Sequence, residues 1–233
     1  MSYSVVYKDI GLMDYKEVWD FQATIFNKLI ENKINPGLEG RMELPGTLIF
    51  VEHPHVYTLG KSGSEQNLLL NSLQLRQKDA SYYRIDRGGD ITYHGPGQIV
   101  GYPIFDLEKI KVSLKDYIHG LEEAVIRTVA EYGIAATRLQ GSTGVWLDVE
   151  IPGKTKKICA IGVKASRYVT MHGFAFNVNT DLNYFRNINP CGITDKGVTS
   201  LEKELGERRD MEEVKMKVKH NLQNVFGLQW VNE

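Results

Sequence analysis

Apolar side chains recur along the chain with two different periods, and each period predicts one class of element. A helical spacing runs over residues 14–33 and again over 113–132, and both stretches open on a polar residue that can cap the first turn. A third amphipathic helix is expected over residues 210–226. Thr199 with Glu202 has the spacing of a capping box, which predicts a short helix ahead of that last one.

Short runs rich in β-branched and aromatic residues lie between these helices and predict strands. The predicted strands are 3–10, 47–51, 56–59, 82–85, 99–105, 135–139, 144–149, 157–163 and 169–178. Because strands and helices do not alternate regularly, we expect an α+β fold, with residues 1–233 forming a single domain. Strands 82–85 and 99–105 flank one glycine-rich stretch, so they are expected to pair with each other. Residues 61–80 show no period and are predicted to form a mobile loop that can cover a site.

Charge and composition narrow the classes of partner. The 28 lysines and arginines nearly balance the 29 aspartates and glutamates, so the chain lacks the basic field that nucleic acid requires. No stretch approaches the roughly 20 apolar residues of a membrane span. The first residues also lack a positive segment followed by an apolar one. We therefore expect a cytoplasmic protein that binds neither nucleic acid nor membrane.

The stretch from Arg87 to Gln98 combines polar side chains with residues that control the backbone. Gly88-Gly89 and Gly95-Pro96-Gly97 predict two tight bends on either side of a short polar strand. A solvent-exposed hairpin is one interpretation of this pattern. Five hydrogen-bonding side chains beside four glycines favour another, in which the stretch is one wall of a binding site.

The two cysteines are too few for a disulfide scaffold and are expected to be reduced thiols. Cys159 sits in the apolar run of a predicted strand and fits a core role. Cys191 lies between Pro190 and Gly192, where the backbone is stiff on one side and uncrowded on the other. That setting exposes a thiol, so Cys191 is the candidate nucleophile.

A nucleophilic cysteine needs a neighbouring cation or base that favours its thiolate. His94, Lys157 and His172 are the candidates. Lys157 is the last lysine of a charged turn and the one that enters the apolar strand, where partial desolvation would make it a usable base. His53 and His55 have no third ligand at a useful spacing, so no metal site is predicted.

Four separated motifs stand out along the chain. They are Arg87-Gly88-Gly89-x-x-Thr92-Tyr93-His94-Gly95-Pro96-Gly97-Gln98, Lys157-Ile158-x-x-Ile161-Gly162, His172-Gly173-x-Ala175-x-Asn177-Val178-Asn179-x-Asp181-Leu182 and Pro190-Cys191-Gly192. In sequence and in order, these motifs resemble the octanoyltransferase family, the lipoyl(octanoyl) transferases that start protein lipoylation. The resemblance also includes Trp19, Gln22 and residues 52–60, and it leaves only residues 148–156 and the last 30 or so individual to this chain.

The resemblance implies a single domain of the biotin/lipoate protein ligase type, with mixed sheets surrounded by helices. It implies transfer of an octanoyl group from octanoyl-acyl carrier protein to a lysine of a lipoyl domain, without a cofactor or a metal. The acceptors would be the lipoyl domains of 2-oxoacid dehydrogenase complexes and the glycine cleavage H protein, and the enzyme would be a monomer. Cys191 would carry the octanoyl group as a thioester, which stays activated for the next transfer. Lys157 would stabilise the thiolate and move protons.

The family's acyl-binding segments fall on three parts of the chain. Their glycines and small residues leave a groove for an eight-carbon chain, whose burial would contribute roughly 0.8 kcal/mol per methylene and about 5 kcal/mol in all. The residues are Arg87, Gly88, Gly89, Asp90, Ile91, Thr92, Tyr93, His94, Ala160, Ile161, Gly162, Gly173, Phe174 and Ala175.

Two other functions stay open on the sequence alone. An ATP-dependent lipoate or biotin ligase of the same fold would activate a free acid as an adenylate and would need no cysteine nucleophile. A catalytically silent module that binds an acyl carrier or a lipoyl domain would keep the groove but would not need both Lys157 and Cys191.

Overall fold

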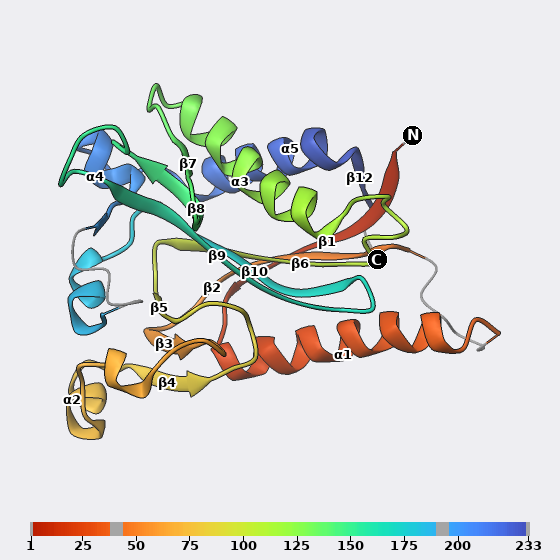
Figure 1. Ribbon diagram of the computed structural model, residues 1–233, viewed down its shortest axis with the longest axis horizontal. Coiled ribbons are helices and arrows are strands. Elements are labelled where there is room, and N and C mark those ends of the chain that lie inside the picture. Colours follow the sequence, from red (N-terminus) through yellow and green to blue (C-terminus); the bar gives the residue numbers. More distant parts are fainter. Residues whose placement is uncertain (1, 38–43, 190–195, 232–233) are drawn as a thin grey trace.

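A nine-stranded mixed sheet forms the centre of the molecule (Figure 1). The computed structural model describes residues 2–37, 44–189 and 196–231. The strands run in the order β12-β1-β2-β6-β10-β9-β8-β7, and β11 pairs with β9. Their bounds are β1 Tyr3–Leu12, β2 Gly46–Glu52, β6 Gln98–Phe105, β7 Thr137–Leu139, β8 Ser142–Leu147, β9 Lys156–Ser166, β10 Val169–Asn177, β11 Gly197–Val198 and β12 Leu228–Val231.

Helices cover both faces of this sheet. Helix α1 (Tyr15–Ile34) lies on one face, and α3 (Leu114–Ala130) and α5 (Met211–Phe226) lie on the other (Figure 1). The predicted caps are confirmed, because the side chains of Asp14, Ser113 and Asp210 accept backbone N–H bonds at the starts of these three helices. Each face has its own apolar core, so the sheet is buried on both sides.

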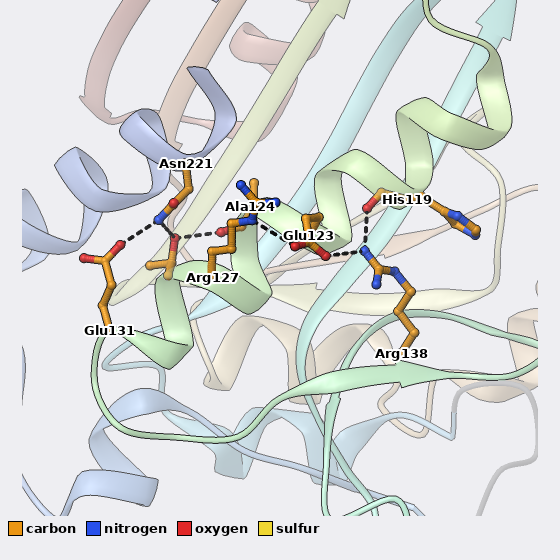
Figure 2. Close-up of polar contacts among 8 residues, drawn as sticks. His119, Glu123, Ala124, Arg127, Glu131, Arg138 and Asn221 are labelled. Carbon is orange, nitrogen blue, oxygen red and sulfur yellow. Dashed lines mark hydrogen bonds and ion pairs between the residues drawn. The ribbon is translucent and has the colours of Figure 1, made fainter. Parts of the chain in front are cut away.

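A polar network joins the two helices of the α3/α5 face, as Figure 2 shows. The Asn221 amide on α5 donates to the Thr128 hydroxyl (3.1 Å) and to a Glu131 carboxylate oxygen (2.8 Å) at the end of α3. Arg138 on β7 donates to Glu123 and to the His119 carbonyl, both at 2.9 Å. These bonds hold α3 between α5 and the β7 edge of the sheet.

A second sheet of three strands packs beside the first and has the order β4-β3-β5. Its strands are β3 (Val56–Leu59), β4 (Ser81–Arg84) and β5 (Ile91–His94). The predicted pairing of 82–85 with 99–105 is wrong, because β4 pairs with β3 while β6 pairs with β2 and β10. Every residue of β6 is buried, which suits an interior strand with neighbours on both sides.

Residues 61–80 contain more structure than the predicted loop. They hold a 3₁₀ turn, η1 (Glu65–Asn67), and a helix, α2 (Ser72–Gln77), which begins with a reciprocal capping box between Asn71 and Gln74. Backbone bonds also tie this stretch to the end of η2 (Leu182–Asn187) and the residues that follow it: the Leu69 N–H donates to the Asn187 carbonyl (2.9 Å), and the Asn189 N–H donates to the Asn67 carbonyl (2.9 Å). Residues 61–80 were predicted to be a loop without regular structure, but they form a segment with a capped helix and backbone hydrogen bonds to the region of η2.

The C-terminal part differs from expectation in two details. Helix α4 (Leu201–Leu205) is capped by Ser200, and the Thr199 hydroxyl instead donates to Glu204. Strand β12 was not predicted, and it pairs in parallel with β1 at the edge of the sheet. Among the helices of the described residues, none is both long enough and apolar enough to cross a membrane.

Candidate active site

One cavity of about 1070 Å³ lies where the large sheet, the small sheet and the start of α1 meet. Such a volume suits a small-molecule substrate. Lys157 and every predicted acyl-binding residue except Tyr93 line it: Arg87, Gly88, Gly89, Asp90, Ile91, Thr92, His94, Ala160, Ile161, Gly162, Gly173, Phe174 and Ala175. Tyr93 faces the other way, because it is buried in the core of the small sheet and stacks on Tyr184 at 4.9 Å between ring centres.

The floor of this cavity carries almost no side chains. On the paired strands β9 and β10, Gly162 lies opposite Gly173, and Ala160 lies opposite Ala175. Alternation along both strands puts these two pairs on the same face of the sheet. A Cβ on Gly162 would come within 2.9 Å of the Gly88 carbonyl oxygen, so glycine at this position lets the glycine-rich stretch approach β9 closely.

The glycine at the centre of β10 lies against the backbone of a neighbouring strand. A Cβ on Gly173 would come within 2.1 Å of the Gly101 carbonyl oxygen. The approaching backbone is therefore the neighbouring strand β6, and glycine is required there for the sheet to close.

The glycine-rich stretch forms the wall opposite this floor. Its two predicted bends are confirmed, since they flank β5. The Gly88 N–H donates to the Val163 carbonyl (2.9 Å), which seats the stretch on β9. Asp90 is buried and accepts bonds from the Asn67 amide (2.6 Å) and the Ile91 N–H (2.7 Å). Its carboxylate therefore stabilises the bend.

Buried polar side chains form a chain of hydrogen bonds behind this wall. Arg87 donates to the carbonyl (2.7 Å) and the hydroxyl (3.0 Å) of Thr58. The Thr58 hydroxyl lies 3.4 Å from His94 Nε2, and His94 Nδ1 lies 2.9 Å from Gln98 Oε1. The Gln98 amide nitrogen donates to Asn177 (2.9 Å). Gln98 Oε1 is thus an acceptor, so His94 carries its proton on Nδ1.

His94 is held in its neutral form. Burial is the main cause that lowers its pKa to about 3, and the neighbouring His53 lowers it further. His53 is also buried, its pKa is lowered to about 4 by burial, and its ring bonds the Met13 carbonyl and the Tyr102 hydroxyl, both at 2.8 Å. His94 is therefore a wall residue and not a base poised near neutral pH.

These two histidines predict acid-sensitive stability. Unfolded histidine binds a proton near pH 6.5 while the folded sites do not, so stability that is present above pH 6.5 is lost as the pH falls. We expect each histidine to lower the free energy of unfolding by up to about 1.4 kcal/mol per pH unit between pH 6 and 5. Urea unfolding at pH 7, 6 and 5 measures this slope, and His94→Gln is expected to remove about half of it. An unchanged slope in that variant would contradict the assignment.

Lys157 and Lys156 point in different directions from the start of β9. Lys157 Nζ lies over the Trp146 ring, 4.4 Å from its centre, and both side chains line the cavity. Lys156 Nζ instead pairs with Asp148 (3.0 Å) and Glu204 (2.8 Å). Of the two lysines, only Lys157 lines the cavity.

The candidate nucleophile Cys191 lies outside the described residues. Asn189 and Lys196, the described residues on either side of that segment, both line the cavity.

Cys159 has the predicted core role: its exposed fraction is 0%, it belongs to the core between the sheet and α3/α5, and burial raises the pKa of its thiol. A buried, protonated thiol is a poor nucleophile.

Cys159→Ala is therefore expected to keep wild-type turnover. The lost packing would lower the free energy of unfolding by about 1 kcal/mol. Steady-state transfer rates and urea unfolding check both parts. A variant that is folded but inactive would point to a mechanism with two cysteines.

Some cavity residues were not predicted from the sequence. Tyr15, Val100, Tyr102, Trp146 and Asn177 also line it. Val100 and Tyr102 are two positions apart on β6, so alternation from Gln98 could have indicated that they share its face. Within the described ranges, no group of three or more His, Cys, Asp or Glu side chains is arranged to hold a metal ion.

Similarity to known proteins agrees with this geometry. The lipoyl protein ligase A/B catalytic domain family matches residues 14–223. An octanoyltransferase from Cytophaga hutchinsonii is 53% identical over 97% of this chain and 93% of its own length. One from Flavobacterium johnsoniae is 55% identical over 97% of this chain and 98% of its own length. The chain belongs to the octanoyltransferase family. The predicted acyltransferase enzyme of lipoylation is thereby confirmed.

Solved structures of similar fold are more distant in sequence than these octanoyltransferases. Lipoate-protein ligase A bound with ATP has a TM-score of 0.71 at 13% identity, over 100% of this chain and 89% of that one. A bipartite lipoate protein ligase from Thermoplasma acidophilum has a TM-score of 0.66 at 14% identity, over 100% of this chain and 86% of that one. They confirm the predicted ligase-type α+β fold. Ligase activity does not follow from them, since fold is shared between functions.

Proposed function

We propose that the enzyme moves an octanoyl group from octanoyl-acyl carrier protein to a lysine of a lipoyl domain, through a thioester on Cys191. One observation carries the proposal. Lys157 reaches a cavity with a Gly/Ala floor, and Asn189 and Lys196, which flank the Cys191 segment, line the same cavity.

Lys157 moves the protons of the first half-reaction. It accepts the thiol proton of Cys191, and the thiolate attacks the carbonyl carbon of the donor thioester. The carbon–sulfur bond to the carrier breaks, and the Lys157 ammonium returns its proton to the leaving carrier thiolate. The octanoyl group is then a thioester on Cys191.

The second half-reaction uses the same lysine in reverse. The acceptor lysine amine attacks the Cys191 thioester, and neutral Lys157 accepts a proton from that amine. The carbon–sulfur bond breaks to give an amide and a Cys191 thiolate, which takes the proton from Lys157. Each cycle returns both residues to their starting states, so no nucleotide is consumed.

The face of the Trp146 ring positions the Lys157 side chain. A cation 4.4 Å from the centre of an aromatic ring is attracted to its face, which holds Nζ at a fixed place at the cavity wall. The Trp146 indole N–H donates to the Ser142 carbonyl (3.0 Å), so the ring itself is held.

Transfer without nucleotide tests the proposal. Purified enzyme is mixed with octanoyl-acyl carrier protein and a lipoyl domain, and octanoylation is followed by mass with and without ATP. We expect equal rates in both, and no product on a lipoyl domain whose target lysine is replaced by arginine. Octanoylation that requires free octanoate and ATP would show a ligase instead.

The nature of the acceptor is tested in the same assay. Lipoyl domains of 2-oxoacid dehydrogenase complexes and the glycine cleavage H protein are both expected to be octanoylated. The organisation of residues 1–233 as one domain, the monomeric state and the cytoplasmic location stay predictions.

A further inference from the structure

We propose that Glu122 is a positioning residue for Lys157. Its buried carboxylate holds the backbone of Gly144, against which the Lys157 side chain lies. The proposal rests on the proposed function, because it takes Lys157 as the residue that moves protons. It adds a group on α3 that acts on the lysine through strand β8.

An irregularity in the pairing of β8 with β9 brings Lys157 opposite Trp146. Val145 pairs with Cys159. The next residue, Trp146, pairs with Lys157, so β9 has one residue more than β8 at this point. Such an extra residue is a β-bulge, which changes the direction in which neighbouring side chains point. Regular antiparallel pairing would instead put Lys157 opposite Leu147. The direction of the lysine therefore depends on the local backbone of these two strands.

Gly144 lies beside this bulge and next to the stem of the lysine. A Cβ at this position would lie 3.4 Å from Lys157 Cε, 3.5 Å from Lys157 Cδ and 2.6 Å from the Cys159 carbonyl oxygen. The stem therefore passes along the Gly144 backbone, while Lys157 Nζ lies over the Trp146 ring. The φ of Gly144 is +126°, which residues with a side chain rarely adopt, so glycine is required there. A shift of this backbone would displace the lysine.

Glu122 restrains this position from α3. One of its carboxylate oxygens accepts the Gly144 N–H (3.0 Å), and the other accepts the Arg138 Nε–H (3.0 Å). Arg138 is held in turn by the Glu123 carboxylate and the His119 carbonyl, as Figure 2 shows. Glycine has the most freedom of any residue in its backbone, so a hydrogen bond to a rigid helix fixes a conformation that its own side chain cannot.

The burial of Glu122 agrees with such a role. Its exposed fraction is 4%, and taking a carboxylate out of water costs free energy that its two bonds must offset. An apolar side chain of similar size would avoid that cost, but it would leave the buried Gly144 N–H without this acceptor. Lysine has a flexible four-carbon stem, and proton transfer requires its nitrogen within hydrogen-bond reach of the reacting atoms. The carboxylate therefore stabilises the one backbone position that limits where the stem can lie.

Shortening the Glu122 side chain is expected to misplace Lys157. Glu122→Ala should lower the octanoyl transfer rate about 10²-fold, the scale on which a displacement of about 1 Å acts. Glu122→Asp keeps the charge but withdraws it by one methylene, so we expect a smaller loss. Arg138→Ala is the matched control, because it removes the other partner of the carboxylate and leaves the Gly144 bond. The Arg138 side chain is 38% exposed, so water can take its place, and the rate should stay close to that of the wild type.

The same Glu122 substitutions in a Lys157→Ala background separate positioning from general stability. If Glu122 acts through Lys157, neither substitution should change the residual rate of Lys157→Ala. A purely structural role predicts an equal fold loss in both backgrounds, because it lowers the amount of folded enzyme. Single-turnover transfer, followed by the mass of the lipoyl domain, measures the rates. The urea midpoint of each variant shows whether it is folded under the assay conditions.

A loss of rate confined to enzymes that retain Lys157 supports the proposal. It would be overturned by an unchanged rate in both Glu122 variants, by a loss of the same size without Lys157, or by an equal loss in Arg138→Ala. If Glu122→Ala does not fold, Glu122→Asp gives the same decision. Failure of the proposed function would appear differently, as no nucleotide-free transfer by the wild type.

Discussion

Cys191→Ser is expected to lower octanoyl transfer by at least about three orders of magnitude, the scale at which loss of a catalytic nucleophile acts. A serine hydroxyl is far less acidic than a thiol, and an acyl ester on serine is less activated than a thioester. The exchange of sulfur for oxygen changes side-chain size little, so the free energy of unfolding should stay close to that of the wild type. Steady-state transfer to a lipoyl domain and urea unfolding measure the two quantities.

Cys159 supplies the matched control for this experiment. Cys159→Ala removes the other thiol, which is buried in the core between the sheet and α3/α5. That variant should transfer at the wild-type rate. Wild-type turnover in Cys191→Ser would contradict the assignment of the nucleophile.

Lys157→Ala is expected to lower the transfer rate by about 10²- to 10⁴-fold, the range that a general acid–base residue contributes. In the proposed mechanism the carbonyl carbon and the acceptor amine both react beside this side chain. No adjacent lysine replaces it, because Lys156 is held by Asp148 and Glu204.

Lys156→Ala is the control variant for Lys157→Ala. Its ion pairs with Asp148 and Glu204 are partly exposed, so their loss should cost at most about 1 kcal/mol of stability and change the transfer rate only a few-fold. If the two variants lose rate equally, Lys157 is not the proton-transfer residue. Single-turnover rates for the two half-reactions would then show which step depends on either lysine.

Local sequence patterns predicted the helices and most of the strands. The main error, the pairing of residues 82–85 with 99–105, concerns contacts between strands that are far apart in the sequence. The caps at Asp14, Ser113 and Asp210 are set by side chains next to the helices that they start, so sequence alone reveals them. The pairing of β6 with β2 and β10 depends on residues about 50 to 80 positions away in the chain. The bends beside β5 instead favoured the prediction of a hairpin between strands that are close in the sequence.

In the candidate site, too, the local motifs predicted which segments line the cavity, but not which way each side chain points. The glycine-rich motif identified the wall, but strand alternation turns Tyr93 away from the cavity while its neighbours Thr92 and His94 line it. The Gly162–Gly173 pair depends on strand register, and the left-handed conformation of His172 depends on Gln22, 150 residues earlier. Neither feature has a signal in the sequence near it.

The covalent intermediate is tested most directly by the intact mass of the enzyme after mixing with octanoyl-acyl carrier protein in the absence of ATP. The wild type should gain the mass of one octanoyl group, the gain should disappear on treatment with hydroxylamine, and Cys191→Ser should show none. A wild-type enzyme that gains no mass yet forms an acyl-adenylate when octanoate and ATP are supplied would contradict the thioester route.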